Sequence, residues 1–267
     1  MGKGRPFLEV FTSALKENYR FPILEVFAFL YAIATFLFAA LGATFSAQSS
    51  EAFAHNLVNS MTGFPLFIFV VLILVNTAYG LGNDVEKGVI QTLLSYPLKR
   101  RTVLTAKLLS ALGIALLLFL GIQVTALFLL TPDIITHYFG TVLLSYLASL
   151  STAFLIAGIV LVVALVLKRG GLAVVIGIVL YFALSIMSTL VSFIVYTGSD
   201  LPFRIYAVIA PNLVLGRYYG GGFVPIFSTG IWTPSFSDVL LYVGASYILV
   251  AFVFVLGYVY FDRRLGI

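Results

Sequence analysis

Residues 134–167 read IITHYFGTVLLSYLASLSTAFLIAGIVLVVALVL and contain no Asp, Glu, Lys or Arg. A helix needs about 20 consecutive, mostly apolar residues to cross the hydrocarbon core of a bilayer. This stretch is long enough, and it lacks the regular alternation of apolar and polar residues that a barrel strand requires. It therefore predicts a membrane-spanning helix.

Similar stretches recur along the chain. Residues 26–50, 52–83, 170–199 and 239–261 also lack these four charged residues, and residues 102–132 contain only Lys107. Their lengths predict six transmembrane helices in one all-α membrane domain that covers residues 1–267. We expect the helices at residues 24–46, 60–82, 103–131, 140–167, 172–196 and 239–261.

The composition supports a membrane protein over a soluble one. Of the 267 residues, 61% are hydrophobic and only 9% are charged, and the mean hydropathy is +1.13. Soluble domains carry about 25% charged residues, so the composition excludes a soluble enzyme. The sequence has no Cys, which excludes disulfides and cysteine metal sites.

The positions of Lys and Arg predict the orientation. Every Lys and Arg except Arg204 and Arg217 falls on one side of the predicted bilayer. Positive residues concentrate on the cytoplasmic side of membrane proteins, so we expect both termini in the cytoplasm of a multi-pass cell-membrane protein. The formal net charge of +5 reflects this topology, and we expect no nucleic-acid partner.

Residues 6–21 predict an amphipathic helix before the first span. Pro6 suits the first turn of a helix. The apolar side chains that share one face are Leu8, Phe11, Leu15 and Tyr19. Such a helix is expected to lie in the cytoplasmic interface of the lipid bilayer.

The loop at residues 83–101 predicts a second amphipathic helix, over residues 84–96. Asn83 or Asp84 can cap its start, and Pro97 ends it. Val85, Val89, Ile90, Leu93 and Leu94 form an apolar stripe, and Glu86, Lys87 and Gln91 point away from it. A helix of this kind can receive a partner protein, or it can be a plain connector between spans.

Two patterns resemble a known family. The sequence Glu86-x-Gly88…Gln91-Thr92-Leu93-Leu94-Ser95-x-Pro97…Arg100…Leu104-x-x-Lys107 resembles the cytoplasmic signature of type-2 ABC transporter permeases, the membrane subunits of ABC exporters. The segment Ile209-Ala210-Pro211-Asn212…Gly216 is similar to a proline-containing segment before the last span of that family. The family also has an interfacial N-terminal helix, six spans and cytoplasmic termini.

The resemblance implies a transporter subunit that is driven by ATP hydrolysis on a separate protein. The sequence has no G-x-x-x-x-G-K-[S/T] loop, so we expect no enzyme activity or cofactor on this chain, and ATP and Mg²⁺ on a separate cytoplasmic ABC ATP-binding subunit. A second copy, or a related permease, would complete the pathway. The residues implied for the coupling helix that meets the ATPase are Asp84, Glu86, Lys87, Gly88, Gln91 and Leu94.

The external connection at residues 198–238 is expected to hold structure. Many Gly and Pro residues interrupt it, but residues 203–210 and 213–219 are strongly apolar. They predict a pair of short re-entrant helices. The resemblance implies an outer gate that includes Pro211 and Asn212, and a surface cap over the bundle is the alternative.

Polar side chains within the spans predict either a substrate path or close helix packing. The residues are Asn76, Thr77, Gln123, Ser149, Ser185, Ser188, Thr189 and Ser192. Their hydroxyl and amide groups, set among aromatic residues, favour a lipid-like or amphipathic cargo.

Other function classes have weaker support. An ion-coupled carrier usually has charged residues near the membrane centre, which the predicted spans lack, and a channel subunit is a further alternative. An intramembrane protease needs a serine or metal site, and no catalytic or metal residues are expected here. The two histidines, His55 and His137, are predicted to be solvated in external loops.

Overall fold

The computed structural model describes residues 5–19, 22–44, 49–95, 98–194, 201–220 and 232–263, and every regular element within these residues is a helix. Within the same residues, six helices are long and apolar enough to cross a membrane. They are Ile23–Gly42, Phe64–Glu86, Arg100–Leu130, Phe139–Leu167, Gly170–Ser192 and Phe236–Arg263. The predicted all-α fold with six spans is confirmed, and residues 45–46 and 195–196 of the predicted spans lie outside the described residues.

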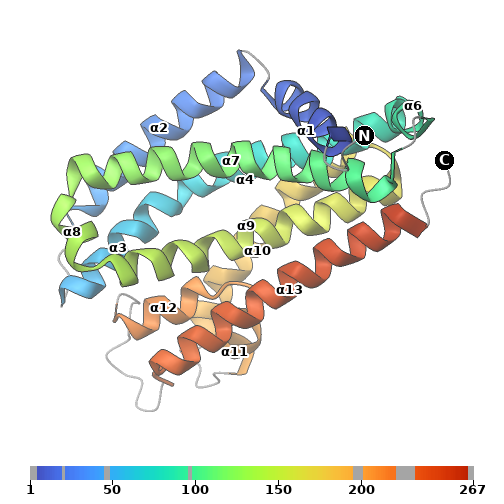
Figure 1. The fold of residues 1–267 in the computed structure, drawn as a ribbon. Coiled ribbons are helices and arrows are strands. Elements are labelled where there is room, and N and C mark those ends of the chain that lie inside the picture. The colour runs from blue at the N-terminus through green and yellow to red at the C-terminus, as the bar shows by residue number, and fades with distance from the viewer. Residues whose placement is uncertain are drawn as a thin grey trace.

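The spans run lengthwise through one bundle (Figure 1). They are α2 (Ile23–Gly42), the combined helix α4 (Phe64–Leu74), η1 (Val75–Tyr79) and α5 (Gly80–Glu86), α7 (Arg100–Leu130), α9 (Phe139–Leu167), α10 (Gly170–Ile194) and α13 (Phe236–Arg263). Helix α9 lies in the middle and packs against α4, α10 and α13. The main core therefore forms where α9 meets the α4–α5 span, around residues such as Phe69, Ile73 and Ile156.

The two ends of the bundle differ in charge. The N-terminal helix, α6 (Val89–Ser95) and the last turn of α13 lie at one end (Figure 1). We call it the basic end, because Lys99, Arg100, Arg101, Lys168 and Arg169 flank the helices there. Helices α3 (Ser50–Thr62) and α8 (Pro132–His137) lie at the opposite end, which we call the far end.

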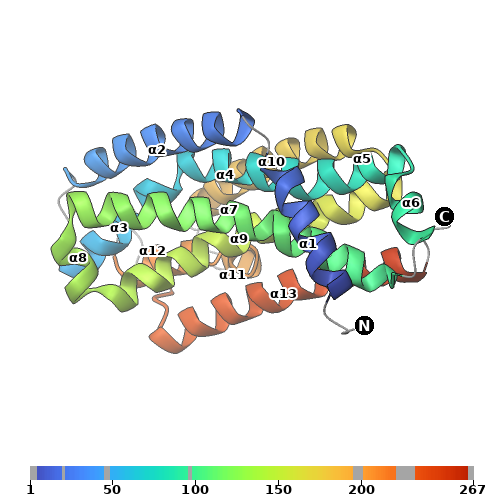
Figure 2. The same cartoon turned by 45° about the horizontal axis from the view of Figure 1, so that its top comes forward.

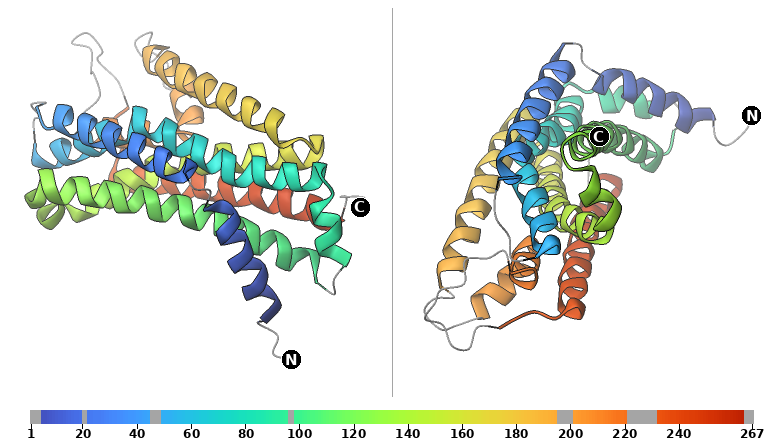
Figure 3. Two further views of the ribbon diagram at one scale, coloured as in Figure 1. Left: turned by 90° about the horizontal axis from the view of Figure 1, so that it is seen from above. Right: turned by 90° about the vertical axis from the view of Figure 1, so that its left-hand side faces the viewer.

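Helix α1 (Arg5–Asn18) leaves the bundle at an angle and packs across α7 (Figures 2 and 3). The predicted helix is confirmed over residues 6–18; Tyr19 lies beyond its end, and residues 20–21 lie outside the described residues. Ala14 and Asn18 are its buried residues, while Leu8 and Tyr19 on the predicted apolar face are exposed. Helix α1 therefore has one side against α7 and a second apolar side directed outward.

The prediction that one span covers residues 60–82 is wrong at its start. Residues up to Thr62 belong to α3, whose Ser49 cap accepts a hydrogen bond from the Ala52 N–H at 3.1 Å. The chain turns at Gly63, and α4 begins at Phe64 with Pro65 in its first turn. The charge-free run at residues 52–83 therefore holds two helices, and only the second one spans.

The prediction that residues 84–96 form one helix is also wrong. The second span continues as α5 to Glu86, and α6 starts at Val89. Between them Gly88 has φ of 74°, a left-handed conformation that favours glycine. The loop at the basic end thus begins only at Lys87, and residues 96–97 lie outside the described residues.

The pair of short helices predicted in the connection at residues 198–238 is present as α11 (Leu201–Ala207) and α12 (Asn212–Tyr218). They bury Phe203, Ala207, Val214 and Leu215 against α9, α10 and α13. Residues 198–200 and 221–231 of this connection lie outside the described residues.

The two arginines at the far end rest on aromatic rings. The Arg204 guanidinium lies 4.6 Å from the ring centre of Trp232, and that of Arg217 lies 3.5 Å from the ring of Phe203. Such contacts stabilise a cation beside an apolar surface. These ring contacts explain how Arg204 and Arg217, the two Lys or Arg residues that the sequence assigns to this side, are accommodated there.

Candidate functional site

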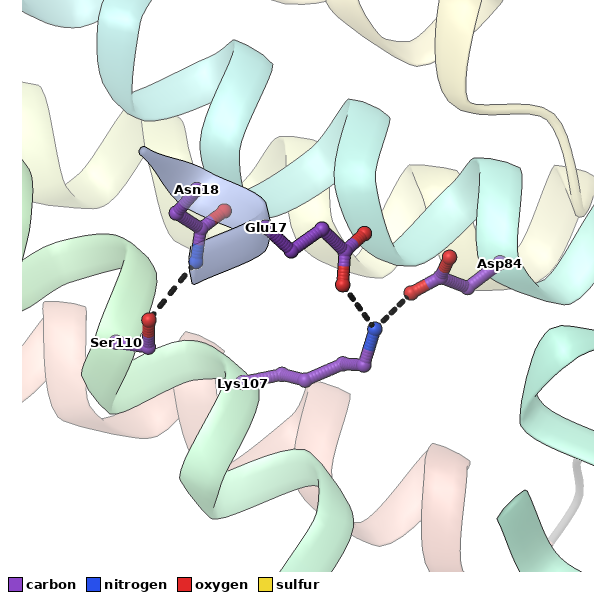
Figure 4. A network of polar contacts seen from close by, with 5 residues as sticks. All are labelled: Glu17, Asn18, Asp84, Lys107 and Ser110. Carbon is purple, nitrogen blue, oxygen red and sulfur yellow. Dashed lines mark hydrogen bonds and ion pairs between the residues drawn. The ribbon is translucent and has the colours of Figure 1, made fainter. Parts of the chain in front are cut away.

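A buried ion cluster joins three helices near the basic end. Lys107 on α7 extends its Nζ between Asp84 Oδ2 on α5 and Glu17 Oε2 on α1, the second at 3.1 Å (Figure 4). Beside it, Asn18 Nδ2 donates to Ser110 Oγ at 3.0 Å. The cluster connects the N-terminal helix, the end of the second span and the start of the third.

The spacing of residues within each helix produces this cluster. Lys107 and Ser110 are three residues apart on α7 and lie on one face. Glu17 and Asn18 end α1 just where it crosses that face. Asp84 is brought in because α5 continues the second span beyond the predicted boundary.

Burial makes the charges in this cluster interdependent. The side chains of Lys107 and Asp84 are 10% and 7% exposed, whereas Glu17 is 41% exposed. Removing one partner of a buried ion pair leaves the other charge without compensation. Asp84 and Lys107 therefore form the tightly held part of the cluster, and Glu17 contacts it from the surface.

The segment predicted to receive a partner divides into inward and outward residues. Asp84 points inward to Lys107, which differs from its predicted place on a docking surface. Leu94 packs against a small core that contains Ile90, Leu104 and Phe261. The exposed residues of the predicted set are Glu86, Lys87 and Gln91, and Gly88 forms the turn between the helices.

Helix α10 starts in direct backbone contact with α5. A Cβ built on Gly82 would lie 2.5 Å from the Cα of Gly170, and one on Gly170 would lie 2.6 Å from the carbonyl oxygen of Tyr79. Only glycine allows the two backbones to approach this closely. The backbones of α5 and α10 therefore meet without an intervening side chain.

Toward the far end, a cavity of about 460 Å³ lies between α4, α9, α10 and the short helices. Of the predicted path residues, Ser149, Ser185 and Ser188 line it, together with the predicted gate residue Asn212. Thr189 and Ser192 are outside its lining and bond to the backbone oxygens of Ser185 and Ser188. The gate residue Pro211 caps α12 next to the cavity.

The remaining path residues are buried away from this cavity. Gln123 bonds to the hydroxyls of Tyr31 and Tyr146 and to the carbonyl of Met61, so it acts as a packing residue. Thr77 bonds to the carbonyl of Ile73 within its own helix. Asn76 lies in the π-helical turn η1 and its buried Nδ2 has no hydrogen-bond partner.

The prediction that His55 is solvated is wrong. It is 1% exposed, its Nδ1 lies 2.9 Å from Ser145 Oγ, and its ring stacks on Tyr219. Burial lowers the pKa of His55 to about 4. His137, by contrast, is exposed on α8 as predicted.

Sequence reasoning missed Glu17, Asn59 and Thr62 as site residues. Asn59 and Thr62 line the cavity from α3, the helix that was not predicted. An amphipathic pattern over residues 50–62 that ends at Gly63-Phe64-Pro65 was the available signal. The pairing of Glu17 with Lys107 left no local signal, because it joins residues far apart in the chain.

Comparison of the chain with protein-family models and with curated proteins found no match. The structure establishes a multi-pass helical membrane protein, and its function has to be inferred from the geometry described above.

Proposed function

We propose that this chain is the membrane subunit of an ATP-driven transporter, similar to type-2 ABC exporters, and that it works with a separate ATP-binding subunit. The proposal rests on how α6 lies at the basic end, with one side buried and the other exposed. Its Ile90 is fully buried, while Glu86, Lys87 and Gln91 beside and on it are exposed. A short helix anchored on one side and polar on the other provides a surface that a cytoplasmic partner can push.

Three contacts would carry such a push into the bundle. Ile90 presses on Leu104 and Phe261 in the small core below α6. The ion pairs of Lys107 with Asp84 and Glu17 connect α7 with α5 and α1. The backbone contact between α5 and α10 would pass the movement of α5 to the fifth span. ATP and Mg²⁺ would be bound by the partner, and this chain would convert the partner's movement into a change of the pathway.

A second copy of the chain, or a related permease, would complete the pathway. Helices α2 and α10 lie toward the same side of the bundle (Figure 3), and α10 is the least buried of the six described spans. The polar residues Ser185 and Ser188 and the cavity lie along α10. A partner that covers this side would enclose the cavity between the two subunits.

One observation favours a second candidate, an ion-coupled carrier. Asp84 and Lys107 are ionisable, buried and within the spans, which is the arrangement of residues that relay protons. They lie close to the basic end of their spans, however, where a structural clamp is the simpler role. Transport into vesicles that needs ATP and survives a protonophore supports the first function, and transport abolished by the protonophore alone supports the second.

The proposed function is tested on the complex purified from native membranes through a tag on this chain. We expect a subunit with a Walker A loop to co-purify and to hydrolyse ATP. Replacing Glu86 by Ala should lower transport per ATP hydrolysed, because the exposed Glu86 would face the partner. Thr136→Ala on exposed α8 is the control, and its coupling should be unchanged. A chain that transports with no ATPase bound would overturn the proposal.

A further inference from the structure

The cavity of about 460 Å³ near the far end has two chemically distinct walls. Phe64, Phe67, Tyr181 and Phe182 form one, with Phe67 centred 5.3 Å from Tyr181 and 5.2 Å from Phe182. Its size falls within the range of about 300–1,000 Å³ that is usual for small-molecule sites. An aromatic wall of this kind accommodates an alkyl chain or a flat apolar ring.

The other wall consists of lining residues with neutral hydrogen-bonding groups, which come from α3, α9, α10 and α12. They are Asn59, Thr62, Ser149, Thr152, Ser185, Ser188 and Asn212. Several of these groups hold one another in place. Asn212 Nδ2 donates to Asn59 Oδ1 at 2.7 Å, and Thr62 and Ser149 share a hydrogen bond at 3.2 Å. The polar wall is thus fixed in position before any ligand arrives.

One acceptor on this wall is left unpaired. The Oδ1 atom of Asn212 is buried and has no hydrogen-bond partner in the protein. Leaving a buried polar atom unpaired has a free-energy cost, and a ligand hydroxyl or amide N–H can remove it. The aromatic wall and the unpaired acceptor are independent features, and both point to a ligand with an apolar part and a hydrogen-bond donor.

The charge of that ligand follows from the lining. None of the described residues that line the cavity is Asp, Glu, Lys, Arg or His. A charged headgroup would lose its hydration there without meeting an opposite charge, which is strongly unfavourable. A neutral hydroxylated headgroup would exchange hydrogen bonds with water for hydrogen bonds with this wall at little cost.

We infer that the cavity binds an uncharged amphiphile, with a hydroxylated headgroup against Asn212 and Ser188 and an apolar chain against Phe67 and Phe182. As a cargo site it rests on the transporter function proposed above, whereas as a binding site it does not. A neutral glycolipid from the bilayer and a water-soluble glycoside share this chemistry.

The test uses the purified chain in nanodiscs, with no ATPase present, and n-octyl β-D-glucoside that carries a diazirine on its alkyl chain. After illumination, mass spectrometry should locate the label within residues 64–67 and 181–188. Unlabelled octyl glucoside should compete, whereas octyl sulfate and octyltrimethylammonium, which have the same chain and opposite charges, should not. Equal competition by either charged probe, or labelling elsewhere, would overturn the inference.

Variants separate binding from folding. Asn212→Leu should weaken octyl glucoside binding by about tenfold, the loss of one buried hydrogen bond. Ser188→Phe should fill the cavity and abolish specific labelling. Thr189→Val, the next residue on α10 but outside the lining, should bind as the wild type does. If both Asn212→Leu and Ser188→Phe melt as the wild type does and keep full labelling, the inference fails.

Two further arms identify the source of the ligand. Competition by monogalactosyl diacylglycerol in the nanodisc supports a lipid that enters from the bilayer, and competition by soluble octyl glucoside alone supports a ligand from water. The labelling test does not depend on an ATPase. If the chain is labelled in nanodiscs but no ATPase co-purifies with it from native membranes, only the proposed function is contradicted. A functional ATPase complex without labelling would contradict only this inference.

Discussion

Lys107 holds two carboxylates from different helices, and the exposure of each partner predicts how much it contributes. Lys107→Met should lower the free energy of unfolding by about 3–5 kcal/mol, because it removes the cation that contacts the buried carboxylate of Asp84. Glu17→Gln should lower it by less than about 1 kcal/mol, since Glu17 is 41% exposed. Denaturant or thermal unfolding in a mild detergent measures both.

The double variant Lys107→Met, Asp84→Leu provides the control. Replacing both partners of a buried ion pair with apolar residues is often neutral, so it should recover most of the stability that Lys107→Met loses. If the double variant is as unstable as the single one, the charge pair is not the reason for the loss.

His55 predicts how stability depends on pH. Its pKa is about 4 in the folded chain and 6.5 ordinarily, so the unfolded chain takes up the proton first as the pH falls. The free energy of unfolding should be highest above pH 6.5 and should fall by about 3 kcal/mol in total as the pH is lowered to 4. Melting temperatures measured across this range test it.

His55→Gln gives the comparison for that measurement, since glutamine can still bond to Ser145 but does not titrate. The variant should show a flatter profile between pH 6.5 and pH 4. An unchanged slope would assign the pH dependence to other groups.

At the scale of elements, the crossing of α5 and α10 gives a prediction with opposite signs at adjacent residues. Gly170→Ala should destabilise by about 1–3 kcal/mol, since the new Cβ would collide with the backbone of Tyr79. Gly171→Ala should be neutral or stabilising by up to about 1 kcal/mol, as no atom lies within 4 Å of its Cβ. Thermal unfolding of the two variants side by side checks the result, and equal effects would contradict this crossing.

The elements that sequence could and could not predict differ for physical reasons. The six spans are set by length and hydropathy, which are local properties, so their positions could be predicted. Helix α3 was not predicted, and its last three residues were assigned to the second span, because residues 52–62 carry no Asp, Glu, Lys or Arg that would mark a boundary. The break at Gly88 was missed because the same apolar stripe fits one helix or two.

For the candidate site, contacts between distant residues were the part that could not be predicted. Ser149, Ser185, Ser188 and Asn212 could be chosen as polar residues within or beside spans, and the structure brings them to one cavity. Asp84 was placed on the docking surface because a single sequence does not reveal that Lys107 is its partner. Gln123 was chosen by the same rule as the serines. Its side chain instead forms buried hydrogen bonds with Tyr31, Met61 and Tyr146, which join neighbouring helices.

At the scale of the whole molecule, the orientation can be tested directly, because the chain has no natural cysteine. Single variants Gln91→Cys and Thr136→Cys place a thiol on exposed residues at opposite ends. In intact cells, a membrane-impermeant maleimide should label Thr136→Cys only, and it should label Gln91→Cys after the cells are opened. The reverse pattern would place α6 outside the cell.

Site-specific photo-cross-linking is the sharpest test of the proposed docking of an ATP-binding subunit on α6. A benzoylphenylalanine at position 91, on the exposed side of α6, is illuminated in native membranes, and the product is identified by mass spectrometry. We expect a cross-link to a protein with a Walker A loop, and none from the same probe at position 136. Transport by a chain whose position 91 cross-links to no ATP-binding protein would contradict it.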